Sequence, residues 1–347
     1  MKRFLMAVFL LLPAAAQQAP VPQARPAPLR PTGEERGPQP GQRRPQGPGM
    51  MPEGPWNQNL RQAVLGVNGK VESQGFFLQS GGVAHLVQDA KGRLIAVFQW
   101  FPQGERELFD QVALSISSDG GKAWTTPRKI IIAGLPESMR RPYDPTLAVV
   151  DEGRLRLYFT SHEQPADSQP SAIYSALSTD GGDSWTFEPG KRFAVEGAQL
   201  QDCAVVRLAG TWHLLCPLPR GAGAMHATSA DGLTFSSGDK IAPEPGWSWI
   251  GNLTATGDKL HFWVGARDSI LRLESSDGVK WSNSAEISLR GMDPGVLPLP
   301  DGRTLLIYTG PPAMHQPRPG YPQPGGPAAP PPREPDVELK RDPPPAK

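Results

Sequence analysis

Three aspartates of this 347-residue chain stand directly before apolar segments, in the stretches DPTLAVV, DCAVVRL and DPGVLPL. They are Asp144, Asp202 and Asp293, and Glu163 follows one of these segments. Paired carboxyl groups, one protonated and one ionised, are what general acid–base catalysis needs. Asp144 and Asp293 each precede proline, and an aspartate in that position also commonly organises the start of a strand. Both roles remain open for these two residues.

Basic and aromatic residues flank the same segments. Arginines can clamp a carboxylate through parallel hydrogen bonds, and aromatic rings with a few charged groups commonly hold small polar ligands. Surface ion pairing is the alternative role of each arginine. The candidate binding residues are Arg141, Tyr143, His162, Arg220, Trp249, Arg267 and Asp293.

The candidate residues are positioned by segments that read as β-hairpins. Each has an apolar, partly alternating run, a turn that contains glycine, and a second run rich in β-branched and aromatic residues. No segment of useful length shows the apolar periodicity of an α-helix. The five hairpins are GGVAHLVQDAKGRLIAVFQW, DPTLAVVDEGRLRLYFTS, DCAVVRLAGTWHLLCPL, NLTATGDKLHFWVG and DPGVLPLPDGRTLLIYTG.

A short turn motif follows the first four hairpins, at intervals of about 45 to 60 residues, which indicates a repeat architecture. Its serine and aspartate can accept backbone hydrogen bonds, its glycine can adopt positive φ, and its aromatic residue can cover the turn. The copies are SSDGGKAW, STDGGDSW, SADGLTF and SSDGVKW. Their structural residues are Ser117, Asp119, Gly121, Trp124, Ser178, Asp180, Gly182, Trp185, Asp231, Asp277 and Trp281.

The motif resembles the Asp-box, or BNR repeat, of sialidase-like β-propellers. The resemblance covers roughly residues 83–310 and implies an all-β propeller of four-stranded antiparallel blades. We predict five blades, with six as the alternative if residues 58–79 contribute more strands. The fifth hairpin has no Asp-box after it, so residues 62–79 are expected to supply its outer strands and close the ring.

The resemblance also implies a site over the central axis, where the hairpin starts meet. There we expect glycoside hydrolysis, with Asp144, Asp202 and Glu163 as catalytic residues. Two departures from the family weigh against it. The Arg-Ile-Pro segment of sialidases is absent, and the first hairpin starts with SGGVAH, without the arginine or aspartate of related enzymes. A non-catalytic propeller that binds glycan or protein is therefore the alternative hypothesis.

The two cysteines fall in the third hairpin. With a two-residue turn at Ala209 and Gly210, Cys203 comes to lie opposite Cys216, at a Cα separation of about 4.5 Å that permits a disulfide. We predict this disulfide, and two buried thiols are the alternative. The sequence contains no metal-ligand spacing and no pattern that calls for a cofactor.

The two ends differ from the propeller in composition. Residues 1–16 read as a secretory signal, with an uncleaved anchor as the alternative, and 17–55 and 311–347 read as disordered, proline-rich segments. The folded domain is then 56–310. A formal charge of +1 argues against nucleic-acid or membrane-surface partners. We expect a secreted or periplasmic protein with a glycan ligand and no integral membrane segment after signal cleavage.

Overall fold

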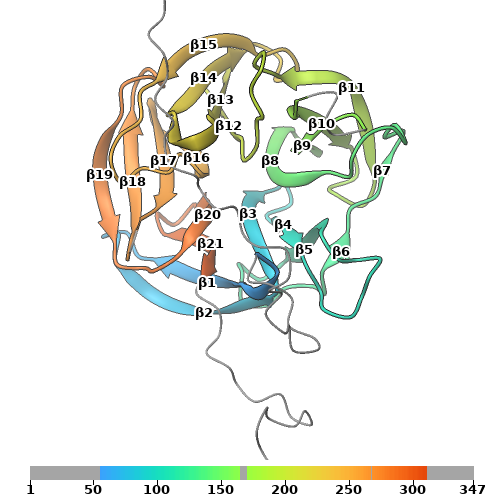
Figure 1. The fold of residues 1–347 in the computed structure, drawn as a ribbon. Helices are drawn as coiled ribbons and strands as arrows, with labels where there is room; N and C mark the ends of the chain where they lie inside the picture. Colours follow the sequence, from blue (N-terminus) through green and yellow to red (C-terminus); the bar gives the residue numbers. More distant parts are fainter. Residues whose placement is uncertain (1–54, 165–169, 267, 311–347) are drawn as a thin grey trace, which may run out of the picture. The chain divides into compact units, whose positions relative to one another are not determined.

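The computed structural model describes residues 55–164, 170–266 and 268–310. The predicted signal segment 1–16 and tail 311–347 lie outside the described residues, as does the predicted linker up to residue 54. The described residues form five antiparallel sheets arranged round an axis, as Figure 1 shows. The prediction of a five-bladed propeller is confirmed.

Each blade is a sheet whose strands follow one another outward from the axis. The first blade contains β3 (Gly81–Gln88), β4 (Leu94–Trp100), β5 (Gln111–Ser117) and β6 (Arg128–Lys129). The second contains β8 (Tyr143–Asp151), β9 (Arg154–Ser161), β10 (Ala172–Ser178) and β11 (Trp185–Phe193), with β7 (Ile132–Ala133) added parallel at its edge.

The third and fourth blades have four strands each. The third contains β12 (Ala204–Leu208), β13 (Thr211–Pro217), β14 (Ala224–Ser229) and β15 (Ser236–Ile241). The fourth contains β16 (Gly251–Thr256), β17 (Lys259–Gly265), β18 (Ile270–Ser275) and β19 (Ser282–Ile287). The described helices are two single 3-10 turns, η1 (Pro55–Asn57) and η2 (Pro219–Gly221), and neither is long or apolar enough to cross a membrane.

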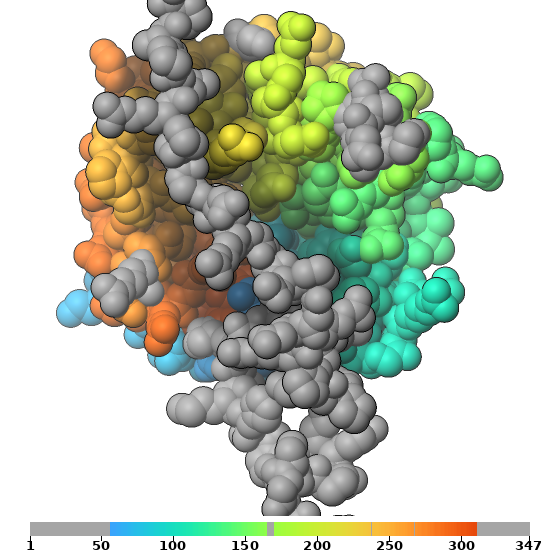
Figure 2. Space-filling model, viewed as in Figure 1, coloured from blue at the N-terminus to red at the C-terminus, as the bar shows by residue number. Residues whose placement is uncertain are grey.

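The fifth blade joins the two ends of the domain. Its inner strands β20 (Met292–Pro298) and β21 (Thr304–Gly310) come from the C-terminal side, and its outer strands β1 (Asn59–Leu65) and β2 (Val71–Gln79) come from the N-terminal side. Figure 2 shows the blue N-terminal atoms beside the orange C-terminal ones. Without β1, strand β21 would present an unpaired edge, so this pairing closes the ring as predicted.

Apolar side chains from facing sheets fill the space between blades. Leu114 of the first blade and Leu147 and Phe159 of the second belong to one buried cluster, and each is at most 1% exposed. Burying a side chain of this size contributes about 1.5–3 kcal/mol. Similar clusters occupy the other described interfaces, so the position of each inner strand is set by the packing of its neighbours.

All four Asp-boxes form a turn held by the serine and aspartate side chains, one residue shorter in the last two copies, and the first copy illustrates it. The Ser117 hydroxyl donates to the Asp119 carboxylate at 2.8 Å and accepts from the Gly121 N–H at 2.9 Å. Asp119 also accepts from the N–H groups of Lys122 and Ala123. Gly121 has φ of +87°, a conformation that favours glycine. The serine and aspartate of the motif thereby satisfy the backbone of a tight turn.

The Asp-box turns also join neighbouring blades, because their carbonyls accept hydrogen bonds from the preceding sheet. Gln62 of the fifth blade donates to the Gly121 carbonyl at 2.9 Å. Arg128 of the first blade donates to the Gly182 carbonyl at 2.6 Å, and Tyr158 of the second donates to the Gly232 carbonyl at 2.8 Å. These turns therefore serve both the local fold and the assembly of the ring.

The structure does not contain the predicted disulfide. Cys203 and Cys216 are both free thiols, and both are buried. The register agrees with the prediction, since Ala204 pairs with Leu215 and the next pair outward would be the two cysteines. However, β12 begins only at Ala204, and Asp202 has φ of +53°, so the chain leaves the ladder before Cys203. The Cys216 thiol instead donates to the Gln201 carbonyl at 3.6 Å.

Candidate active site at the axial end of the propeller

One residue at the start of each inner strand adopts a left-handed backbone conformation. The φ values are +50° for Val83, +50° for Asp144, +53° for Asp202, +57° for Trp249 and +46° for Asp293. Few non-glycine residues adopt such values, and for a β-branched valine the conformation is a genuine outlier. Its recurrence in all five blades shows a shared local design at one end of the axis.

Bulges account for this conformation in three of the five inner ladders, and in the other two the left-handed residue lies just before the strand. The pairing of β3 with β4 shifts between Gly82 and His85, and that of β20 with β21 shifts between Met292 and Gly295. The pairing of β8 with β9 shifts in the same way just after Tyr143. A bulge bends its strand and re-aims the side chains beside it. Here the left-handed residue always lies two positions before the first regular pair of the ladder.

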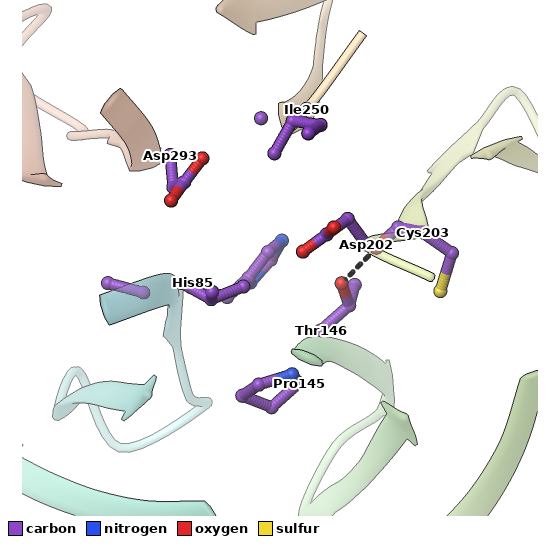
Figure 3. A pocket seen from close by; sticks show the side chains of 10 residues that line it. His85, Pro145, Thr146, Asp202, Cys203, Ile250 and Asp293 are labelled. Carbon is purple, nitrogen blue, oxygen red and sulfur yellow. Dashed lines mark hydrogen bonds between the residues drawn. The ribbon is translucent and has the colours of Figure 1, made fainter. Parts of the chain in front are cut away.

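A small pocket lies where these strand starts meet (Figure 3). Asp202 and Asp293 line it from opposite sides, and His85 extends between them. Its volume of about 10 Å³ gives room for about one water molecule, so a larger ligand has to sit above this floor. The lining residues are Val83, Ala84, His85, Pro145, Thr146, Asp202, Cys203, Ile250, Gly251 and Asp293.

Three carboxyl groups interact electrostatically at this site. Burial and the charge of Asp293 raise the pKa of Asp144 to about 7. Burial and the charges of Asp144 and Asp293 raise the pKa of Asp202 well above its usual range, and burial raises the pKa of Asp293 to about 6. Carboxylates in a low-dielectric site cannot all ionise. The site therefore holds protons at neutral pH.

Asp144 and Asp202 are joined by hydrogen bonds. The Asp144 carboxylate accepts from the backbone N–H of Asp202, which favours its ionised form. The two side chains also share a hydrogen bond that raises the pKa of Asp202. Because a carboxyl–carboxyl hydrogen bond needs one proton between the two groups, Asp202 is the member that retains it. The two residues act as one unit, with Asp293 across the pocket.

His85 is a residue of the site that the sequence analysis did not single out. It is 6% exposed, and neither of its ring nitrogens has a hydrogen-bond partner within the protein. Burial lowers its pKa to about 3, so the imidazole is neutral at physiological pH. The signal in the sequence was the histidine of GGVAH, two residues after the position that holds aspartate in three other blades.

Tyr143 precedes Asp144 and interacts with it, and Arg141 bonds to the loop before β5 of the first blade. Tyr143 is half-buried, and burial together with the charge of Asp144 raises its pKa. The Arg140 guanidinium lies 4.6 Å from the centre of the Tyr143 ring. Arg141 is exposed and forms an ion pair with Asp110, which also accepts a hydrogen bond from a glutamine side chain.

Other predicted site residues lie apart from the pocket. Glu163 is exposed and pairs with Met139 in an isolated β-bridge. The third member of the carboxyl cluster is Asp293 and not Glu163. His162 is buried and its backbone carbonyl accepts from the N–H of Arg140. Arg220 is exposed on the turn η2, and Arg267 lies outside the described residues.

Trp249 is not available for stacking on a sugar. Its side chain is 2% exposed and packs against the rings of Phe262, at 5.5 Å, and Trp281, at 6.0 Å. The indole fills the core between the third and fourth blades, because burial of its large apolar surface there stabilises the fold. The half-buried Trp247 lies edge-on to it at 5.5 Å.

Metal-binding side chains are not clustered in the described ranges, where no three His, Cys, Asp or Glu residues are placed to hold one ion. The carboxyl groups of the axial site instead lie close enough to repel one another and share protons. The chemistry open to this arrangement is proton transfer between a ligand and carboxyl groups of different proton affinity.

Solved structures of several glycoside-processing enzymes are similar to this chain. The RS223 β-xylosidase is 11% identical, with a TM-score of 0.50, over 66% of this chain and 91% of its own. The GH43_1 enzyme from Xanthomonas citri is 12% identical, with a TM-score of 0.50, over 66% and 87%. The exo-β-1,3-galactanase 1,3Gal43A from Clostridium thermocellum is 12% identical, with a TM-score of 0.50, over 72% and 58%. At such identities the likeness shows the fold alone.

No curated protein matches the chain. Residues 92–319, which make up more than half of the sequence, match a family of BNR repeat-like domains. This range contains all four Asp-box turns and the inner strands of four of the five blades. The protein therefore belongs to the BNR repeat-like domain family.

Proposed function

We propose that this protein is a carbohydrate-active propeller that binds the terminal unit of a glycan at the axial end and hydrolyses its glycosidic bond. The observation that carries the proposal is the meeting of Asp144, Asp202 and Asp293, from three blades, with raised pKa values. Glycoside hydrolysis needs a proton donor and a proton acceptor of this kind. A fold that only needed stability would gain little from crowding three carboxyl groups together.

The carboxyl groups have distinct roles in the proposed reaction. Asp202 retains its proton and donates it to the leaving oxygen as the glycosidic bond breaks, while Asp144 holds the acid in place through their hydrogen bond. Asp293, which is mostly ionised at neutral pH, accepts a proton from a water molecule as that water bonds to the anomeric carbon. The position of Asp293 across the pocket from Asp202 supports this division.

The proposed chemistry differs from that of sialidases, which use a tyrosine nucleophile. The raised pKa of Tyr143 makes its phenolate harder to form, since burial is the main cause. Tyr158 is wholly buried and its hydroxyl donates to the Gly232 carbonyl. Neither tyrosine fits the nucleophile role, and a carboxyl-based reaction is therefore the better proposal.

A non-catalytic propeller that binds glycan or protein through the same face is the second candidate. It is favoured by Val83, which occupies the position in the first blade where three other blades carry aspartate. For either candidate, the apolar segment at residues 4–12 supports a secreted or periplasmic location.

The test is turnover of a panel of fluorogenic glycosides by the wild type and by Asp202→Asn, Asp144→Asn and Asp293→Asn. We expect each variant to lose activity by at least about 100-fold, because general acid–base catalysis contributes that much or more. Asp301→Asn is the matched control, since Asp301 lies in the exposed turn at the far end of the same hairpin as Asp293.

The outcomes separate the two candidates. Turnover that survives all three substitutions would remove these carboxyl groups from the proposed active site. An absence of turnover on every glycoside, together with glycan binding that Asp202→Asn weakens, would favour the non-catalytic candidate.

A further inference from the structure

We propose that an uncharged sugar unit binds above the axial pocket, and that one of its hydroxyl groups enters the pocket and hydrogen-bonds to His85 at the floor. The inference rests on the proposed function and narrows it to a class of ligand. It sets the protein apart from those sialidase-like propellers that bind an acidic sugar. Two independent features of the site support it, its charge and the unpaired nitrogens of His85.

The charge of the pocket disfavours an acidic sugar. Asp202 and Asp293 line it, and Asp144 interacts with both. A ligand carboxylate above this floor would add a fourth acidic group to three that already repel one another. Like charges in a site of low dielectric raise each other's pKa and oppose joint ionisation. A neutral ligand avoids this repulsion and can still hydrogen-bond to the carboxyl groups.

The arginines beside the site are already engaged. Arg141 is paired with Asp110, and Arg140 lies over the Tyr143 ring and 3.9 Å from the same aspartate. None of the residues that line the pocket in the described part of the chain is basic at neutral pH. The described residues that line the pocket therefore supply no bidentate arginine clamp for a carboxylate.

His85 has the hydrogen-bonding capacity that a hydroxyl group requires. As a neutral imidazole it presents one N–H donor and one acceptor nitrogen, and a hydroxyl can accept from the first and donate to the second. Both nitrogens lack partners within the protein even though the side chain is buried, with only 6% of its surface exposed. A buried polar group without a partner is costly, so its placement in the pocket points to a partner from outside the chain.

The experiment measures binding rather than turnover, by ligand-observed NMR at pH 7. The probes are methyl β-D-xylopyranoside and methyl β-D-galactopyranoside as neutral sugars, and methyl β-D-glucuronide and the methyl glycoside of N-acetylneuraminic acid as acidic ones. We expect a neutral probe to bind at least about tenfold more tightly than either acidic probe. His85→Leu should weaken that binding by about tenfold, the effect of one lost hydrogen bond in a buried site.

His85→Gln is the matched variant, because an amide keeps a donor and an acceptor and should restore part of the affinity. It also preserves the test if His85→Leu does not fold. Tighter binding of an acidic probe, or no binding of either neutral probe, would overturn the ligand class. Binding of a neutral probe that both variants leave unchanged would remove His85 from the site.

This result can be told apart from that of the turnover experiment. Neutral sugar binding without hydrolysis would leave the inference standing and remove the proposed catalysis. Hydrolysis of a sialoside through the three aspartates would do the reverse.

Discussion

The Thr146 hydroxyl donates a hydrogen bond to the backbone carbonyl of Cys203, and so joins the starts of two neighbouring inner strands. Figure 3 shows this bond at the edge of the axial pocket. Thr146 follows Asp144 by two residues, and Cys203 follows Asp202 directly. The bond therefore ties together the two strand starts whose aspartates share a hydrogen bond.

Thr146→Val tests this link. Valine keeps the shape of the side chain but leaves a buried carbonyl without its donor, which we expect to lower the free energy of unfolding by about 1–3 kcal/mol. It should also loosen the Asp144–Asp202 pair, so that the two carboxyl groups titrate more independently. Urea unfolding and the carbon-13 chemical shifts of the aspartate carboxyls measure the two effects. Thr146→Ser keeps the hydroxyl and should stay close to the wild type in both, and equal values for both variants would contradict the link.

The stability of the protein should depend on pH through Asp293. Its pKa rises from 3.8 in the unfolded chain to about 6 in the fold, so the folded protein keeps a proton that the unfolded chain has lost. The stability that Asp293 contributes is fully present below its unfolded-state pKa of 3.8, and it is lost as the pH rises through about 6. Each proton held in this way changes the free energy of unfolding by about 1.4 kcal/mol per pH unit.

Asp293→Asn removes this dependence, because asparagine does not ionise. We expect the variant to gain stability relative to the wild type between pH 5 and pH 8, measured by urea unfolding at both values. His85 and His226 act in the opposite sense because their pKa values are lowered from 6.5. The stability that they contribute is lost as the pH falls below that value. Both proteins contain these histidines, so the comparison largely cancels them. A difference that is constant with pH would refute the raised pKa.

A mostly buried ion pair within the second blade, between Arg156 and Glu188, should contribute to stability far more than an ion pair on the surface. Arg156 and Glu188 pair at 2.8 Å with side chains 6% and 17% exposed, and Arg156 also donates to the Asp231 carbonyl of the next blade. Arg156→Met would leave Glu188 unpaired in a partly buried site, at a cost of about 3–5 kcal/mol.

Arg154→Met is the matched control for this substitution. Its partner is Asp151, and both side chains are nearly half exposed, so solvent screens the pair and little stability should be lost. Chemical denaturation of both variants measures the contrast. Equal losses would mean that the buried pair and the bond from Arg156 to the third blade stabilise the protein no more than an exposed ion pair does.

The two thiols should be present and unreactive in the native protein. Burial raises the pKa of both Cys203 and Cys216, which leaves little of the thiolate that alkylating reagents attack. Mass spectrometry after treatment with iodoacetamide should find no adduct on the native protein. After unfolding without a reductant it should find both cysteines alkylated. Alkylation only after reduction would show that they form the disulfide first expected from the sequence.

Local patterns predicted the architecture because a propeller is built from short-range interactions. The turn at Ser117 to Trp124 is specified by hydrogen bonds within a few residues, so its recurrence could be recognised without knowledge of the fold. The half-built fifth hairpin likewise required a partner strand from 62–79, and β1 and β2 supply it. The same reasoning placed Asp144, Asp202 and Asp293 at strand starts.

The sequence by itself determined the repeats, the blades, the closure of the ring and the aspartates that begin three of its inner strands. Only the tertiary structure decided which side chains meet at the axis. It buried Trp249 in the core, left Glu163 on the surface, and brought His85 between Asp202 and Asp293. The physical reason is that side-chain direction at the strand starts depends on bulges in three blades and on packing between blades, which joins residues from distant parts of the chain.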